Sequence, residues 1–188
     1  LTRHRLGDAP QVRGFRRVSR LEGVKEVVSQ FLVDRPAERI GLVVFGATSY
    51  LQSPLTLDHE LLRKLVESLR VGVAGDGTAI GDGLGLSVKR VHELTGKSKA
   101  IVLLTDGVNN SGNVNPLKAA RIARDLGIKV HTIGIGSSKT AEESMIPGLF
   151  GQFGNPAAEF DEKLLREIAS MTGGVYFNAD SVARLREV

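Results

Sequence analysis

Apolar residues recur along the chain with two periods that alternate from one segment to the next. Helical spacing, with apolar residues three or four apart, predicts helices at residues 20–35, 57–69, 79–94, 115–126 and 161–171. Short apolar runs predict buried strands at residues 40–45, 100–104, 128–135 and 175–177. Residues 48–55 are predicted to form an edge strand, because an edge tolerates Pro54. The alternation predicts an α/β fold, a Rossmann-like open and mainly parallel sheet with helices on both faces.

Local signals support the predicted helix ends. Pro36 stops the first helix, Asp58 is expected to cap the second, and Pro116 suits the first turn of the fourth. Glycines in the third helix are expected to permit close packing against the sheet, namely Gly81, Gly83 and Gly85. The side chains expected to face the core are, helix by helix, Leu21, Val24, Val28 and Phe31; Leu61, Leu62, Leu65 and Leu69; Ile80, Leu84, Val88 and Val91; Ala119, Ile122, Ala123 and Leu126; and Leu164, Leu165 and Ile168.

Positive charge is concentrated at the start of the chain. The formal net charge of the 188 residues is +4, but residues 1–20 hold six arginines against one aspartate, so they carry +5 and the remainder carries −1. Phe15 is the one aromatic residue among these arginines, which favours a solvated segment over a nucleic-acid-binding arm. We therefore expect a basic irregular segment at residues 1–18, followed by one domain at residues 19–188.

Composition indicates a folded domain, with 41% apolar and 24% charged residues. No run reaches the roughly 20 apolar residues that a membrane helix needs. Because the chain starts at Leu1 and stops at Val188 within a helical pattern, we expect a fragment of a longer protein, with any membrane anchors outside it.

Residue types limit the chemistry that the chain can perform. Cysteine is absent, so a metal ion must be held by oxygen or by histidine. The four histidines lie too far apart to form a ligand motif, and His59 and His92 are expected to face solvent or to cap helices. A phosphate loop, a dinucleotide fingerprint and a nucleophile elbow are all absent from the sequence. We therefore do not expect an enzyme.

Asp106 is the first candidate for a functional side chain. It follows the apolar run at residues 100–104, at the carboxyl end of a predicted parallel strand, where open α/β folds place their ligands. The alternative is that the Asp-Gly pair only shapes a turn. Thr78 lies in a second glycine-rich loop, Gly75-Asp76-Gly77-Thr78, and its hydroxyl could bind a ligand or cap the next helix.

One long irregular stretch, residues 136–160, contains Met145, Ile146, Leu149, Phe150 and Phe153. Loops of this length are usually functional or mobile. Its apolar side chains could fold back on the core or form a surface for a partner.

Four segments together resemble the von Willebrand factor type A (VWA) domain, and most of all the version found in bacterial Bat aerotolerance-type membrane proteins. They are RIGLVVFGATSYLQSPLT, GDGTAIGDGLGLSV, LLTDGVNNSG and VHTIGIG, in this order. The resemblance implies a metal-ion-dependent adhesion site (MIDAS) for Mg²⁺ or a similar ion, with Thr78 and Asp106 as metal ligands. Hydroxyl and carboxylate oxygens suit such hard cations.

The chain departs from the family pattern at its start. The family's Asp-x-Ser-x-Ser loop, which ends the first, central strand, is absent, and residues 1–18 hold Pro10 and five arginines instead of an apolar run. We interpret the chain as truncated, with the first central strand missing and the metal site incomplete. Because unpaired central edges are a liability, we expect another strand, a swapped chain or an oligomer to fill the gap.

The resemblance implies a non-enzymatic protein-interaction module that binds an acidic group of a partner through the ion. Alternatives are a Mg-dependent enzyme that processes nucleotides or phosphates, and a scaffold that needs no metal and uses residues 145–153 for contact. Similarity to Bat-type proteins further implies a bacterial membrane anchor, an extracytoplasmic location and co-operation with a MoxR-type ATPase system.

Overall fold

The structure is a computed structural model that describes residues 20–94, 98–105, 107–135 and 156–178. The predicted basic segment, Asp106 and the apolar residues at 145–153 lie outside the described residues. The described helices are α1 (Arg20–Val33), α2 (His59–Ser68), α3 (Ile80–His92), α4 (Pro116–Asp125) and α5 (Pro156–Thr172). The described strands are β1 (Ile40–Phe45), β2 (Ser49–Thr56), β3 (Ala100–Thr105), β4 (Lys129–Gly134) and β5 (Tyr176–Asn178).

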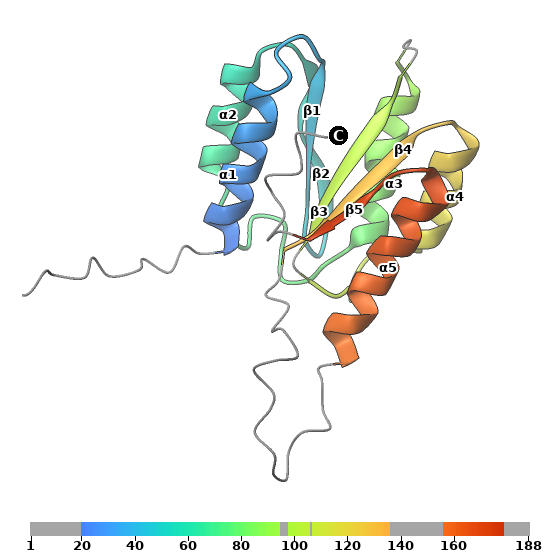
Figure 1. The fold of residues 1–188 in the computed structure, drawn as a ribbon. Coiled ribbons are helices and arrows are strands. Elements are labelled where there is room, and N and C mark those ends of the chain that lie inside the picture. Colours follow the sequence, from blue (N-terminus) through green and yellow to red (C-terminus); the bar gives the residue numbers. More distant parts are fainter. Residues whose placement is uncertain (1–19, 95–97, 106, 136–155, 179–188) are drawn as a thin grey trace, which may run out of the picture.

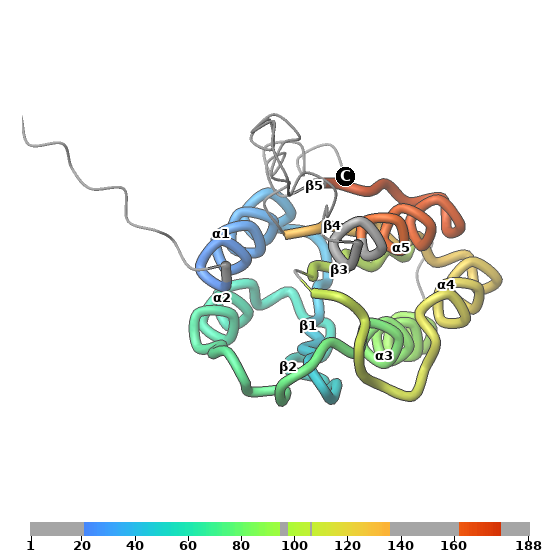
Figure 2. Tube along the Cα trace, turned by 90° about the horizontal axis from the view of Figure 1, so that it is seen from below, coloured from blue at the N-terminus to red at the C-terminus, as the bar shows by residue number. Residues whose placement is uncertain are grey.

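The strands form one layer between two layers of helices (Figures 1 and 2). Helices α1 and α2 lie on one face, and α3, α4 and α5 lie on the other. The order across the layer is β2, β1, β3, β4, β5. Strands β3, β4 and β5 pair in parallel, whereas β1 and β2 form a separate antiparallel pair. The predicted open α/β fold with helices on both faces is confirmed.

Helix ends follow from the expected local chemistry. The Asp58 carboxylate accepts a hydrogen bond from the Leu61 backbone N–H at 2.9 Å, which confirms it as the cap of α2. Helix α4 is capped by the Asn115 side chain and begins at Pro116, whose missing N–H costs nothing there. Helix α5 ends before Gly173, which adopts a φ of +71°. It starts at Pro156, earlier than predicted, and so takes in the end of the stretch predicted to be irregular.

The main core lies between β3, β4 and the layer of α3, α4 and α5. It is built from apolar side chains of all five elements, among them Ile80, Leu84, Ile101, Val130 and Ile168. Two glycines bring α3 close to its neighbours: Gly83 packs against the sheet, as predicted, whereas Gly81 packs against the loop before α4 and Gly85 makes no close contact. A methyl group at Gly83 would meet the Phe45 ring at 2.8 Å, and one at Gly81 would overlap the Val114 carbonyl.

Several predicted inward faces are wrong by part of a helical turn. Helix α1 buries Val27 and Leu32 instead of the four predicted residues, which are only half-buried. In α2, Val66 is buried together with the predicted Leu62, while Leu61 is 45% exposed. In α4 the predicted Ala119 and Ala123 are buried, together with Ala120, whereas the predicted Ile122 and Leu126 are exposed. Alanines allow α4 to pack closely, and the two larger residues lie on the outer side of the helix.

Two strands predicted to be fully buried are not. Strand β1 has no buried residue despite its apolar sequence. Strand β3 alternates, with Ile101, Leu103 and Thr105 buried and the residues between them half-buried or exposed. Both strands have one edge without a partner among the described strands. The incomplete burial therefore coincides with the place where the sheet is divided. None of the described helices is both long and apolar enough to cross a membrane.

Candidate functional site

The carboxyl ends of β1 and β3 meet the start of α3 at one edge of the strand layer. The Ala79 backbone N–H, at the start of α3, donates to the Gly46 carbonyl just after β1 at 2.7 Å. The next residue back, Thr78, pairs with the loop after β3, because its carbonyl accepts from the Asn110 backbone N–H at 3.1 Å. The strand ends that parallel folds use for ligands therefore converge on residues 78 and 79.

Thr78 does not cap the helix that follows it. The cap residue of α3 is Ala79, which has no side chain to supply a hydrogen bond. Thr78 is held instead through its backbone, since its N–H donates to the Asn110 side-chain oxygen at 2.8 Å. Among the described residues, the Thr78 hydroxyl takes part in no hydrogen bond. The structure thus favours the interpretation of Thr78 as a displayed hydroxyl over the alternative of an ordinary cap.

Asparagine side chains from the loop after β3 replace the missing cap. The Asn109 side-chain oxygen accepts from the Ile80 backbone N–H at 2.9 Å, in the first turn of α3. In return, a side chain of α3 binds the backbone of the loop: the Asp82 carboxylate accepts from the backbone N–H groups of Val114 at 2.7 Å and Asn113 at 3.0 Å. These reciprocal contacts lock residues 78–82 to residues 109–114, which fixes the position of Thr78.

Sequence reasoning did not identify this lock. The signal was present as two consecutive asparagines after a strand and an acidic residue in the first helical turn, both common near helix starts. The Asp82 carboxylate is held to residues 113 and 114 by these backbone hydrogen bonds.

Gly107 lies close to the Thr78 hydroxyl. A methyl group at residue 107 would lie 2.6 Å from the Thr78 side-chain oxygen, which is closer than real contacts allow. The Gly107 N–H donates to the Thr105 hydroxyl at 3.2 Å, so the chain turns tightly at the end of β3. The structure thus brings Thr78 against a residue adjacent in sequence to Asp106, which itself lies outside the described residues.

The side chain that this edge offers to a metal ion has an oxygen as its ligand atom. Among the described residues, no three His, Cys, Asp or Glu side chains gather into a metal-binding group. What the described part supplies is one hydroxyl, that of Thr78, which makes no hydrogen bond among the described residues and lies close to Gly107. A hydroxyl is a ligand of hard divalent cations, which keep several waters when few protein ligands are present.

The rings of His59 and His131 contact the backbone of other elements. His59 approaches two backbone carbonyls, with Nδ1 3.2 Å from the Leu32 oxygen and Nε2 2.9 Å from the Glu38 oxygen, in keeping with the predicted capping role. His131 on β4 accepts a hydrogen bond on Nδ1 from the Val175 N–H at 3.2 Å. Burial, and then the nearby positive charges of Lys129 and Arg35, lower the pKa of His131 below 6.5.

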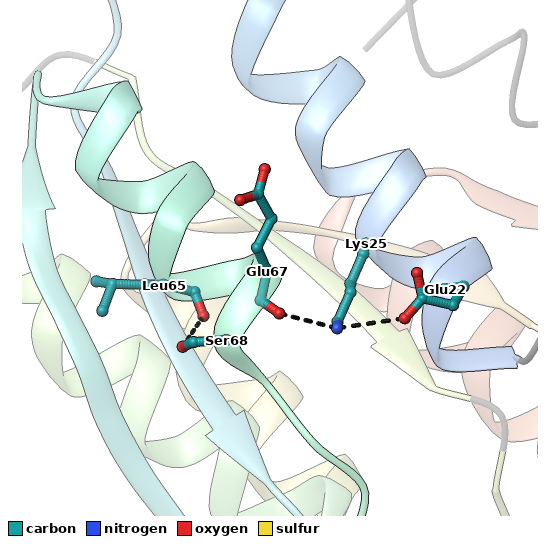
Figure 3. Close-up of polar contacts among 5 residues, drawn as sticks. All are labelled: Glu22, Lys25, Leu65, Glu67 and Ser68. Carbon is teal, nitrogen blue, oxygen red and sulfur yellow. Dashed lines mark hydrogen bonds and ion pairs between the residues drawn. The ribbon is translucent and has the colours of Figure 1, made fainter.

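A recess lies between α1 and the carboxyl end of α2, beside the polar contacts of Lys25 (Figure 3). It has a volume of about 330 Å³ and is lined by Glu22, Lys25, Glu26, Ser29 and Glu67. The Lys25 ammonium donates to the Glu67 carbonyl at 3.0 Å and to the Glu22 carboxylate at 3.3 Å. Lys25 thereby satisfies a carbonyl at the carboxyl end of α2, where a positive charge also complements the helix dipole. These contacts explain the position of the Lys25 side chain without a ligand.

Comparison with known proteins supports the resemblance found in the sequence. The family model described as the von Willebrand factor type A domain matches residues 12–188. An uncharacterized protein of Borreliella burgdorferi is 32% identical over 164 residues, which cover 86% of this chain and 48% of that protein. The chain spans about half the length of the curated relatives it matches.

Solved structures share the fold. An aerotolerance-related membrane protein of Bacteroides fragilis superposes with a TM-score of 0.71 at 24% identity, covering 91% of this chain and 86% of that one. Proximal thread matrix protein 1 of the mussel byssus, with a zinc-occupied MIDAS motif, superposes with a TM-score of 0.64 at 22% identity, covering 88% of this chain and 38% of that one. At these identities the likeness concerns the fold alone.

Proposed function

The chain belongs to the von Willebrand factor type A domain family, and we propose that it binds an acidic group of a protein partner through a divalent cation. Members of this family are generally non-enzymatic modules for protein interaction, and a structural neighbour carries zinc in its MIDAS motif. Thr78 and Asp106 are the residues that we assign to the ion. Mg²⁺ or another hard divalent cation is the proposed cofactor.

The observation that carries the proposal is the unused hydroxyl of Thr78. A threonine at the start of a helix normally caps it, yet here Asn109 satisfies the N–H of Ile80 and Thr78 is left without that task. Two hydrogen bonds with Asn110 hold the Thr78 backbone, and the Thr78 side chain lies close to Gly107, the residue after Asp106 in the sequence. The arrangement is explained if the hydroxyl and the carboxylate serve the same ligand.

The ion would supply the attraction for the partner. Two protein oxygens occupy a minority of the six positions around an octahedral Mg²⁺, so water and a carboxylate of the partner can take others. With two ligands the site alone is weak, and binding of metal and partner is expected to be cooperative. Each acidic ligand that the partner adds increases the favourable charge interaction with the ion.

Calorimetric titration of the full-length protein with Mg²⁺ tests the ligand assignment. We expect Asp106→Asn to weaken binding by roughly tenfold or more, since it removes a carboxylate ligand. Asp76→Asn is the matched control, because Asp76 is an exposed carboxylate in the same loop as Thr78. If both variants bind Mg²⁺ equally well, general electrostatic attraction explains the binding and the assignment of Asp106 is wrong.

We also propose a membrane-associated setting for the whole protein. The support is the likeness to an aerotolerance-related membrane protein, together with relatives about twice as long as this chain. A membrane anchor outside the described residues, an extracytoplasmic domain and a partner in a MoxR-type ATPase system would fit a non-enzymatic interaction module.

A further inference from the structure

The edge of the strand layer opposite the candidate site brings three lysines together. Strands β3 and β4 are parallel and follow α3 and α4 in the chain, so the carboxyl ends of these helices lie beside the amino ends of the strands (Figure 1). Lys89 belongs to the last turn of α3, Lys99 directly precedes β3, and Lys129 begins β4. We call the surface around these three lysines the amino edge.

Hydrogen bonds hold the parts of the amino edge together. The Lys129 backbone N–H donates to the Lys99 carbonyl at 3.2 Å. The Lys99 ammonium donates to the carbonyl of His92, the last residue of α3, at 3.2 Å. The end of α3 and the starts of β3 and β4 therefore form one surface, and the three positive charges lie on it.

Acidic side chains nearby do not compensate this charge. The acidic residues at the ends of α3 and α4 are Glu93, which pairs with Arg90 at 3.8 Å, and Asp125, which pairs with Arg124 at 2.9 Å. None of the ion pairs between described residues includes any of the three lysines. These lysines carry +3, whereas residues 21–188 as a whole carry −1. The positive charge is therefore concentrated at the amino edge.

The helix dipoles reduce the positive charge of the amino edge but do not cancel it. The carboxyl ends of α3, α4 and α5 each contribute about half a negative charge, which is less in total than three full positive charges. The dipole of α3 explains the positions of Lys89 and Lys99 near its end. Lys129 begins a strand, and its side chain makes no hydrogen bond among the described residues, so the fold gives no reason for this charge.

Exposed aliphatic side chains flank the lysines. Leu126, the residue that ends α4, is 38% exposed and lies three residues before Lys129. Val175 is 50% exposed and is hydrogen-bonded to β4 through its backbone. Residues 89–102 and 122–131 contain no Phe, Tyr or Trp on which a nucleic-acid base could stack. Cations beside exposed aliphatic side chains suit the interface of an anionic lipid bilayer.

We propose that the amino edge docks on a lipid surface that carries anionic headgroups. Lys89 and Lys129, which are both exposed, contact the phosphates, while Leu126 and Val175 lie at the level of the headgroups. The inference rests on the membrane-associated setting proposed above and is independent of the metal site. Because a few lysines bind such a surface weakly, docking requires a protein that is already held at the membrane. The candidate site, at the opposite edge, then faces away from the bilayer.

Acetylation of lysines in the full-length protein, measured residue by residue with mass spectrometry, tests the inference. The protein is reconstituted with vesicles of phosphatidylcholine alone or of phosphatidylcholine and phosphatidylglycerol. We expect Lys89 and Lys129 to react at least about threefold more slowly with the anionic vesicles, because the bilayer covers them and its negative potential keeps them protonated. Lys118 and Lys163, exposed in the first halves of α4 and α5, are internal controls that should react equally in both.

Salt and three variants separate this contact from other causes of protection. The protection should disappear at about 1 M NaCl, where charges are screened beyond roughly 3 Å. Lys129→Glu should abolish the protection of Lys89, whereas the matched variant Lys118→Glu should leave it intact, since both substitutions are on exposed residues. Asp106→Asn should also retain the protection, so that a failure of the metal site can be distinguished from a failure of this inference.

Several outcomes would overturn the inference. Equal acetylation of Lys89 and Lys129 in both kinds of vesicle would show that the amino edge does not meet the lipid, and protection of Lys118 and Lys163 instead would turn the opposite edge to the bilayer. Duplex DNA that protects the amino edge as well as anionic vesicles do would assign it to nucleic acid. Protection without vesicles that falls on dilution would assign it to a second copy. A protein that does not sediment with phosphatidylcholine vesicles would contradict the membrane-associated setting and the inference with it.

Discussion

At the scale of single residues, the candidate site depends on two asparagines that make the hydrogen bonds usually made by a helix-capping residue. Asn109 performs the capping that a threonine before a helix would perform, and Asn110 fixes the backbone of Thr78. Thr78 and Asp106 were identifiable from the sequence because each follows a recognisable glycine-rich or apolar pattern. The asparagines were not, because their contacts join loops about 30 residues apart and depend on how the strands are arranged.

His131 should make the stability of the fold depend on pH. Its pKa is lowered in the folded state, so the unfolded chain binds the proton more readily. The contribution of the neutral ring is complete above pH 6.5 and is lost as pH falls through this value towards the lower folded pKa. Urea denaturation should therefore give a lower midpoint at pH 5 than at pH 7.5.

The variant His131→Asn provides the comparison, since the Asn side-chain oxygen can accept from the Val175 N–H without titrating. We expect the dependence on pH to become weaker in this variant and to persist in His92→Asn, because His92 is exposed. Equal slopes in wild type and His131→Asn would show that other groups cause the dependence.

At the scale of elements, the sequence predicted every described strand and helix and most of the buried faces of α3 and α5, but only part of the buried faces of α1, α2 and α4. Periodicity identifies an apolar face, whereas burial also depends on what covers that face. Strand β1 is apolar yet incompletely buried because one of its edges has no described partner. In α4 the predicted Ala119 and Ala123 are buried but the predicted Ile122 is exposed, because the helix packs against its neighbours through its small residues.

Two glycines of α3 should respond in opposite ways to the same substitution. At Gly81 a methyl group would overlap the backbone of Val114, so Gly81→Ala should destabilise the protein by about 1–3 kcal/mol through overpacking. At Gly85 the nearest contact would be the Val114 side chain at 3.8 Å. Gly85→Ala should therefore be neutral or stabilising by up to about 1 kcal/mol, because alanine favours helix.

Urea denaturation of both variants measures this difference directly. Because Val114 belongs to the loop locked to residues 78–82, Gly81→Ala should also weaken Mg²⁺ binding, while Gly85→Ala should leave it unchanged. Equal stability of the two variants would contradict the close packing of α3 against residue 114.

At the scale of the whole molecule, the fold brings two loops together at the end of a divided strand layer. The VWA fold class, with helices on both faces, follows from sequence pattern and is confirmed by the structure and by the family match. What the pattern could not supply is the separation of the strands into two sheets, since hydrogen bonding between strands depends on neighbours that are distant in sequence. The candidate site joins the ends of β1 and β3, which belong to different sheets, so it depends on how the two sheets are placed.

The most direct test of the central claim is paramagnetic line broadening by Mn²⁺ in the NMR spectrum of the full-length protein. Mn²⁺ takes the same oxygen ligands as Mg²⁺ and broadens the signals of nearby amides. We predict that the amides of Thr78 and Gly107 broaden at the lowest Mn²⁺ concentrations and recover when excess Mg²⁺ is added. Preferential broadening around Glu22 and Glu67, in the recess between α1 and α2, would contradict the account.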